Sequence, residues 1–151
     1  MNIFPKGMSI SSNIDIEVSR DNSNIKYKDL LFDTVTKKVV VKDGKTEITN
    51  KKQQVQQWIF LLIHTEMDKY KVYQDTEFGI RFLYEMRGHE FYSSGFTMAQ
   101  IKDELEEKLL LNDNIQKVES IEITKTFNSL EFDIVVIVED ETVESEVSIN
   151  V

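Results

Sequence analysis

The sequence predicts an α+β fold with an N-terminal β meander, a central buried helix, a second amphipathic helix and a C-terminal three-stranded antiparallel β meander. Three observations support this. Residues 50–63, around Trp58, carry apolar side chains at helical spacing, and residues 97–111 repeat that spacing. Residues 121–124 and 144–151 alternate in the way typical of a half-buried strand.

Size and composition narrow the class of protein. The chain has 151 residues, enough for one domain with its own core. It has no cysteine, so disulfides and thiolate metal sites are excluded. The formal net charge of -9 argues against a nucleic-acid-binding surface. Without a membrane-spanning apolar run or a secretory signal, we expect a protein made in the cytoplasm, with neither nucleic acid nor membrane as a partner.

The first 24 residues carry the weakest pattern. Ile14, Ile16 and Val18 alternate with polar neighbours, between two segments of turn-forming residues. We expect residues 1–24 to form an arm that is mobile or adds one strand to a partner. A single domain is predicted to follow over residues 25–151.

Residues 27–49 predict short strands joined by two turns. One turn is expected at residues 36–38. The other is expected at Asp43 and Gly44, because glycine accepts a positive φ there.

The central helix is predicted to begin after Asn50, an N-cap residue with Gln53 in the capping-box position. Phe60 and Leu61 lie off its apolar stripe, which predicts a helix buried on two sides. His64 lies near the C-terminal end of the helix, where we expect it to interact favourably with the helix dipole rather than to bind a metal. The apolar stripe consists of Val55, Trp58, Ile59, Leu62 and Ile63.

Between the two helices the pattern is shorter. Residues 70–73 predict a strand, followed by a loop to Gly79 and a turn or short helix at residues 80–83. Residues 88–95 predict a loop whose aromatics, Phe91 and Tyr92, are expected to pack against the core.

Thr97 is predicted to cap the second helix, with Gln100 as its capping-box partner. The helix is expected to end near Leu111. Its acidic run at residues 103–107 is expected to face solvent. The predicted core stripe is Met98, Ile101, Leu105 and Leu109.

The last third of the chain predicts three strands. Residues 130–138 are apolar on both faces, which predicts a central strand covered on both sides. The final strand alternates buried positions with a wet face that consists of Glu144, Glu146, Ser148 and Asn150.

Catalytic motifs are missing from the sequence: it has no nucleophile elbow, Walker loop or dinucleotide fingerprint. The carboxylates at Glu66, Asp68, Asp75 and Glu77 are candidates for a glycosidase pair, which needs two carboxyl groups about 5–9 Å apart. A chain with 27 acidic residues brings such groups together by chance. We therefore expect no enzyme activity and no catalytic, cofactor-binding or metal-binding residues.

The order of several short motifs resembles the XkdS-like proteins of contractile-tailed phages and defective prophages. These are similar to the sheath-wedge family of baseplate proteins, once labelled tail lysozymes. The resemblance covers residues 27–151. Its motifs are VQQ at 55–57, LIHTE at 62–66, YKVY at 70–73, FG at 78–79, EMRG at 85–88 and LLNDNI at 110–115.

The resemblance implies a structural baseplate wedge component of a phage, a prophage or a phage-tail-like bacteriocin. Its implied partners are the sheath protein and other wedge subunits, with multiple copies in a ring. It would be assembled in the bacterial cytoplasm and then reside in the tail baseplate. The family links baseplate to sheath by β-strand addition to a sheet edge. Its EPR-like motif has no counterpart at residues 66–70, so contacts of that motif are not carried over.

Two surfaces are expected to bind these partners. One is the loop with Asp75, Thr76, Glu77 and Gly79. The other is the final strand, through Glu144, Glu146, Ser148 and Asn150. Two alternative functions remain: a peptidoglycan-degrading tail lysozyme, and a tail-assembly adaptor absent from the finished particle.

Overall fold

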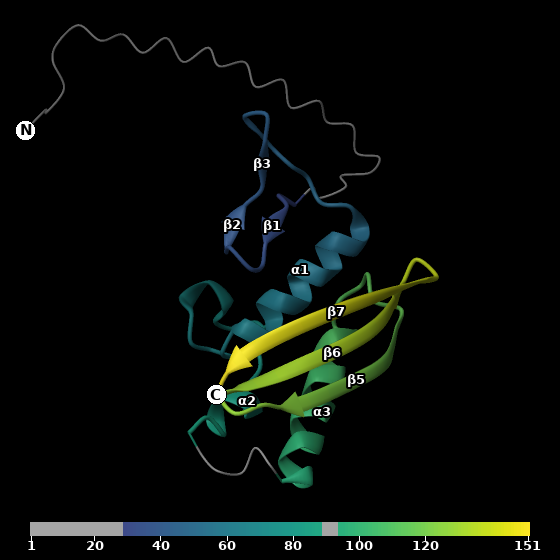
Figure 1. The fold of residues 1–151 in the computed structure, drawn as a ribbon. Helices are drawn as coiled ribbons and strands as arrows, with labels where there is room; N and C mark the ends of the chain where they lie inside the picture. The colour runs from purple at the N-terminus through teal and green to yellow at the C-terminus, as the bar shows by residue number, and fades with distance from the viewer. Residues whose placement is uncertain (1–28, 89–93) are drawn as a thin grey trace, which may run out of the picture.

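The computed structural model of the protein describes residues 29–88 and 94–151 (Figure 1). The predicted arm, with its strand signal at residues 14–18, lies outside the described residues, as do Phe91 and Tyr92. The division into an arm and one domain therefore stays a prediction.

The described chain has the predicted α+β architecture. Small antiparallel strand pairs precede the helices, and a three-stranded antiparallel sheet closes the chain. The elements are β1 (Phe32–Asp33), β2 (Lys38–Val39), β3 (Val41–Lys42), β4 (Lys45–Thr46), α1 (Lys51–His64), the 3-10 helix η1 (Lys71–Tyr73), α2 (Phe82–Glu85), α3 (Gly95–Leu110), β5 (Lys117–Lys125), β6 (Ser129–Val138) and β7 (Glu141–Asn150).

The N-terminal meander consists of two separate pairs, β1 with β2 and β3 with β4. The turn at Asp43 and Gly44 has the positive φ predicted for the glycine, 75°, and Asp43 also has a positive φ, 51°. Side-chain amides attach the meander to α1. Gln57 accepts a hydrogen bond from Phe32 N and donates one to Leu30 O at 3.2 Å, while Gln54 donates to Asp29 Oδ2 at 2.8 Å.

The predicted capping box begins α1. Asn50 Oδ1 accepts from Gln53 N at 2.8 Å, and Gln53 Oε1 accepts from Asn50 N at 3.0 Å. The prediction of burial on two sides is wrong: Leu61 is 44% exposed and Phe60 is only partly buried. The cause is tertiary, because the large sheet covers one side of α1 and the small meander covers only part of the rest.

The predicted strand at residues 70–73 is also wrong. The chain instead forms η1, in which Tyr73 N donates to Tyr70 O at 2.9 Å and Val72 is 75% exposed. Strand-forming side chains need a neighbouring strand, and none of the described elements pairs with this segment.

A parallel bridge between Glu66 and Ile80 brings the two ends of the intervening loop together. Gly79 sits beside this bridge with a φ of 112°. A Cβ atom at this position would lie 2.9 Å from Thr65 O and 3.0 Å from Met67 Cα. Glycine is therefore required by both backbone conformation and space.

The turn or short helix predicted at residues 80–83 is the helix α2, which begins two residues later, and a side chain of α3 accepts hydrogen bonds at its N-terminus. Glu104 Oε1 accepts from Arg81 N at 2.7 Å, and Oε2 accepts from Phe82 N at 2.8 Å. The N–H groups at the start of a helix have no carbonyl partner within that helix, and Glu104 supplies one for each of these two. One member of the acidic run that was expected to face solvent thus joins two helices.

Helix α3 begins earlier than predicted. Ser94 is its N-cap, and Ser94 Oγ accepts from Thr97 N at 3.1 Å. Thr97 lies buried in the first turn. Both residues are good caps in isolation, so only the course of the chain decides between them. The core stripe is confirmed at Ile101, Leu105 and Leu109, while Met98 is partly buried.

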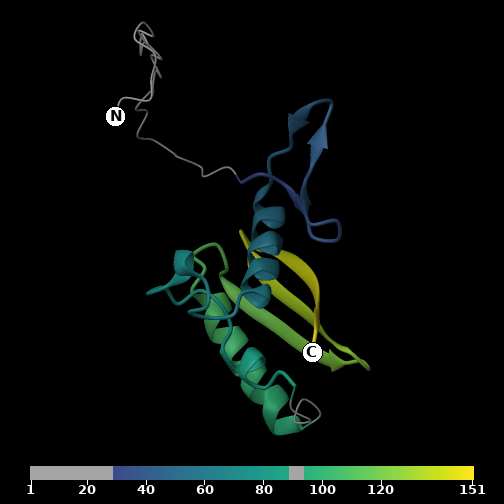
Figure 2. The ribbon, with the colours of Figure 1, turned by 90° about the vertical axis from the view of Figure 1, so that its left-hand side faces the viewer.

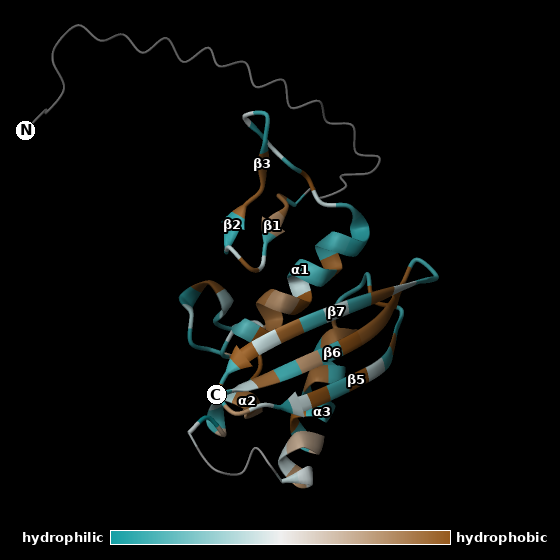
Figure 3. Cartoon of the chain, viewed as in Figure 1, coloured by the Kyte–Doolittle hydropathy of each residue, from teal (hydrophilic) through white to brown (hydrophobic). Residues whose placement is uncertain are grey.

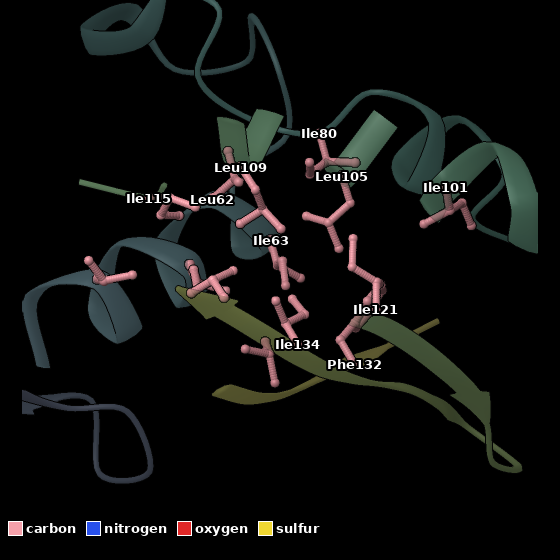
Figure 4. Close-up of a cluster of buried hydrophobic side chains, with 14 of the residues drawn as sticks. Leu62, Ile63, Ile80, Ile101, Leu105, Leu109, Ile115, Ile121, Phe132 and Ile134 are labelled. Carbon is pink, nitrogen blue, oxygen red and sulfur yellow. The ribbon is translucent and has the colours of Figure 1, made fainter. Parts of the chain in front are cut away.

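The C-terminal meander has the order β5-β6-β7. Helices α1 and α3 lie over the same face of this sheet, α1 against β7 and α3 against β5 (Figures 1 and 2). Side chains from both helices and the sheet meet in one core (Figure 4). The inward-facing residues of β6 and β7 are Leu130, Phe132, Ile134, Val136, Val138, Val143, Ser145, Val147 and Ile149.

The other face of the sheet is open among the described residues. Glu131 and Asp133 of β6 are exposed, and Val135 and Ile137 are only partly buried. The prediction that this strand is covered on both sides is therefore wrong within the described chain. No second layer of helix or sheet from residues 29–88 or 94–151 packs on it.

The two faces of α1 should respond differently to truncation. Ile59 is completely buried, so Ile59→Ala is expected to lower the free energy of unfolding by about 2–5 kcal/mol. Leu61→Ala removes an exposed side chain and should lower it by less than about 0.5 kcal/mol. Urea denaturation of both variants measures this. Equal losses would contradict the assigned core face.

The loop closure at Gly79 is tested by Gly79→Ala, which should lower the free energy of unfolding by roughly 2–3 kcal/mol. Gly88→Ala is the matched control, since Gly88 also has a positive φ, 83°, but has open space around its Cα. It should lose only about 1 kcal/mol. Thermal or urea unfolding compares the two, and a larger loss for Gly88→Ala would argue against the close approach.

Candidate functional site

Strand β7 forms one edge of the three-stranded sheet. A two-residue turn at Glu139 and Asp140, both with positive φ, closes the hairpin at the Val138–Glu141 pair. In an antiparallel ladder, alternate residues then point their backbone N–H and C=O groups away from the partner strand. On β7 these residues are Thr142, Glu144, Glu146, Ser148 and Asn150.

Most of these edge groups are unpaired in the part of the chain that the structure describes. The exception is Glu144 O, which accepts a hydrogen bond from Gln56 Nε2 of α1 at 2.7 Å. The edge-facing backbone groups of Glu146, Ser148 and Asn150 have no partner among residues 29–88 and 94–151. An added strand would satisfy them.

The opposite edge, β5, is less suited to accept a strand. Its ladder with β6 is interrupted by a register shift between Val118 and Ser120. Lysines stand at both of its ends, at Lys117 and Lys125. Bulges and edge lysines are devices that discourage edge pairing. Strand β7 runs in continuous register from Glu141 to Asn150, with hydrophilic and hydrophobic residues in alternation (Figure 3).

A groove follows the β7 edge on the side of α1 and the N-terminal meander. It consists of three neighbouring hollows that share wall residues, and we call it the β7 groove. Gln56 and Glu144 line the first and second hollows, while Phe60 lines the second and third. Ser148 and Asn150 line the third. The groove therefore runs alongside the open backbone groups.

The walls of the groove combine apolar and polar groups. The Phe60 ring stacks on His64 with a centroid distance of 4.1 Å, and it lies 6.2 Å from the Phe32 ring. His64 Nδ1 lies 2.9 Å from Phe60 O, near the C-terminal end of α1. Ser145 lines the middle hollow and is 7% exposed, and its hydroxyl has no hydrogen-bond partner among the described residues. Buried hydroxyls normally have a hydrogen-bond partner, so the Ser145 hydroxyl is free to bond a group that enters the groove.

Positive charges gather at the end of the groove near Asn150. Lys37, Lys69 and Arg87 line the third hollow there. Lys69 Nζ donates to Glu66 Oε2 at 2.6 Å, and this hydrogen bond and the Glu66 charge raise the pKa of Lys69. Nearby, the hydroxyl of Thr36 and the backbone N–H of Val35 donate hydrogen bonds to the Asp33 carboxylate and lower its pKa. The same hydrogen bonds hold the turn that carries Lys37.

The structure separates the two sets of predicted partner-binding residues. Glu144, Glu146, Ser148 and Asn150 share the edge and the outer face of β7, and all four line hollows of the β7 groove. Thr76 and Glu77 line a different hollow with Trp58, Leu62, Phe78, Lys108 and Leu111.

The predicted partner-binding residues of this loop also stabilise its conformation. Thr76 Oγ1 donates to Tyr73 O at 2.6 Å, and Lys108 Nζ donates to Glu77 O at 2.8 Å. Asp75 adopts a φ of 63°, and Gly79 closes the loop. Partner binding by either set stays a prediction.

Sequence reasoning missed Gln56, Phe60 and Ser145 as groove residues. Gln56 meets Glu144 across 88 positions of the chain, so no local pattern connects them. A serine among the inward-facing positions of an otherwise apolar strand face was the one available signal.

Two of the four candidate glycosidase carboxylates, Glu66 and Asp68, are engaged in exposed ion pairs. Glu66 pairs with Lys69 at 2.6 Å and Asp68 with Arg81 at 3.2 Å. Within residues 29–88 and 94–151, no cluster of three or more His, Asp or Glu side chains is placed to hold a metal ion. Nor does any helix of that part of the chain have the length and apolar character needed to cross a membrane.

Comparison with known families agrees with the contractile-tail resemblance. The family model for the contractile injection system sheath initiator matches residues 28–141, which include all the described elements up to the start of β7. No curated protein matches the chain. The match confirms the resemblance to a baseplate and sheath-related family of contractile tails. The chain belongs to the family of contractile injection system sheath initiators.

Proposed function

We propose that this protein is a structural, non-enzymatic component of a contractile-tail baseplate, and that it starts the sheath by accepting a strand of the sheath protein at the β7 edge. The supporting observation is the open edge of β7, flanked by the β7 groove, in a member of the sheath-initiator family. Sheath and baseplate proteins are the partner classes that this family role implies.

The added strand would pair with the edge between Glu146 and Asn150. These five residues span roughly 16 Å at about 3.3 Å per residue. Gln56 already satisfies the Glu144 carbonyl, so this amide marks the end of the open edge. Each backbone hydrogen bond contributes about 0.5–1.5 kcal/mol net, so one short strand binds weakly. Several copies in a ring would hold the sheath through multivalency.

The remaining surfaces fit attachment to the baseplate. The loop with Asp75, Thr76, Glu77 and Gly79 lies away from the β7 groove and would contact other wedge subunits. Assembly would occur in the bacterial cytoplasm, and the finished protein would remain in the tail baseplate.

Strand addition at β7 is tested by Glu146→Pro. The Glu146 N–H faces away from β6, so proline removes an edge donor without breaking the ladder with β6. The variant should keep the native circular dichroism spectrum and lose co-sedimentation with polymerised sheath protein. In a deletion strain it should yield baseplates without attached sheath.

Lys125→Pro is the matched control, because the Lys125 N–H faces away from β6 on the opposite edge. It should bind sheath as the native protein does. If Glu146→Pro binds sheath normally, the β7 edge is not the attachment site. Loss of binding in Lys125→Pro alone would assign attachment to β5.

The absence of enzyme activity is tested by zymography on bacterial cell walls. The purified protein should produce no clearing in a gel where a known lysozyme does. Clearing that disappears in Glu66→Gln or Glu77→Gln would contradict the structural role and favour a tail lysozyme.

A further inference from the structure

The outer face of the sheet carries a row of like charges in register. Glu122 of β5 lies directly opposite Asp133 of β6, and Asp133 lies directly opposite Glu146 of β7. Glu122, Asp133 and Glu146 are all exposed. Like charges directly opposite each other on neighbouring strands repel, which destabilises the sheet. The row ends at the β7 edge, where a further strand would continue it.

No cation of the described chain neutralises this row. The ion pairs among residues 29–88 and 94–151 involve Glu139, Glu141, Glu66 and Asp68 as their acidic members. Glu144, which precedes Glu146 on the same face of the strand, is likewise absent from them. The acidic half of the β7 edge therefore offers carboxylates that an incoming strand can pair.

The charge changes sign along the groove. Glu144 and Glu146 line its first two hollows, with Lys52 also in the first, whereas Lys37, Lys69 and Arg87 outnumber Glu66 around the hollow beside Ser148 and Asn150. The two ends of the same edge thus favour opposite charges on a bound strand. Such polarity distinguishes the correct register from one shifted by two residues, which backbone hydrogen bonds alone cannot do.

Resting on the proposed strand addition, we propose that charge selects the strand that β7 accepts. That strand carries a lysine or arginine directly opposite Glu146 and an acidic side chain toward the Asn150 end. The basic residue would lie next to Glu146 at the end of the row of three carboxylates and offset part of their mutual repulsion. Opposite charges in directly opposed positions stabilise strand pairing.

The inward-facing positions of the strand follow from the groove. Side chains that alternate with the basic residue point toward the hollows beside Ser145 and Val147. Phe32 and Phe60 supply apolar wall there, which suits an apolar side chain. The unpartnered Ser145 hydroxyl suits a polar atom on the neighbouring position. The recognised segment is therefore an amphipathic strand with a basic residue on its outer face opposite Glu146.

Charge selection is tested with Glu146→Lys, Glu146→Gln and the full native chain, each titrated with sheath protein at low salt. Reversing the charge should weaken binding about tenfold, and Gln should weaken it by a few fold. Glu107→Lys, on the exposed face of α3, changes the net charge equally and should bind as the native protein does. Binding by the native chain should weaken between 50 and 300 mM salt, as expected for an exposed pair.

Synthetic peptides test the rule independently of sheath assembly. Two seven-residue alternating peptides differ only in a central outward lysine or glutamate, and fluorescence anisotropy measures their binding. The native chain should prefer the lysine peptide, and Glu146→Lys should prefer the glutamate peptide. Equal binding of the two peptides by the native chain, or binding of neither, overturns charge selection.

The failure of this inference is distinguishable from failure of strand addition. If Glu146→Lys binds sheath as tightly as the native chain while Glu146→Pro does not, charge selection is wrong and strand addition stands. If Glu146→Pro also binds normally, strand addition at β7 fails and the charge rule fails with it.

Discussion

The main constraint on this structure is that a three-stranded sheet has one apolar face to cover and two edges to manage. Helices α1 and α3 cover the inner face, and their buried side chains join those of β6 and β7 in one core. Covering the face leaves the edges open. The β5 edge carries a register shift and terminal lysines, while the β7 edge is regular. The molecule is therefore asymmetric in the edge that it presents.

Helix α1 connects the sheet to everything before it. Its buried face packs on the sheet, and its amide side chains make specific links in other directions. Gln57 accepts a hydrogen bond from the backbone of β1, and Gln54 donates one to the Asp29 carboxylate. Gln56 donates one to the Glu144 carbonyl at the β7 edge. Lys51 and Lys52 add exposed pairs to Glu139 and Glu141, whose contribution is small. The walls of the β7 groove are thus positioned by one rigid helix.

The acidic outer face has a consequence for the free protein. Two β7 edges that paired with each other would bring the acidic face of one copy beside that of the other. The repulsion disfavours that pairing while leaving the edge open to a basic strand. An exposed regular edge can then exist in a monomer without serving as a template for copies of itself. The row of carboxylates lowers the stability of the sheet slightly, and under the proposed charge rule it would make strand addition more selective.

The sequence alone determined the features that depend on local period and local hydrogen bonds. Alternation placed Glu144, Glu146, Ser148 and Asn150 on the wet face of the last strand, and the Asn50–Gln53 capping box located the start of α1. Each of these is decided within a few residues of the chain. The order of short motifs likewise indicated the contractile-tail family.

Only the tertiary structure decided what depends on neighbours. Residues 70–73 have strand-forming side chains, but no strand within residues 29–88 or 94–151 lies beside them, and they form η1. Ser94 and Thr97 are both competent caps, and the path of the chain selects Ser94. The β7 groove combines residues as far apart as Gln56 and Glu144, and the charge row combines three strands in one register. Strand pairing and edge exposure are properties of assembled elements, so no period within a single segment contains them.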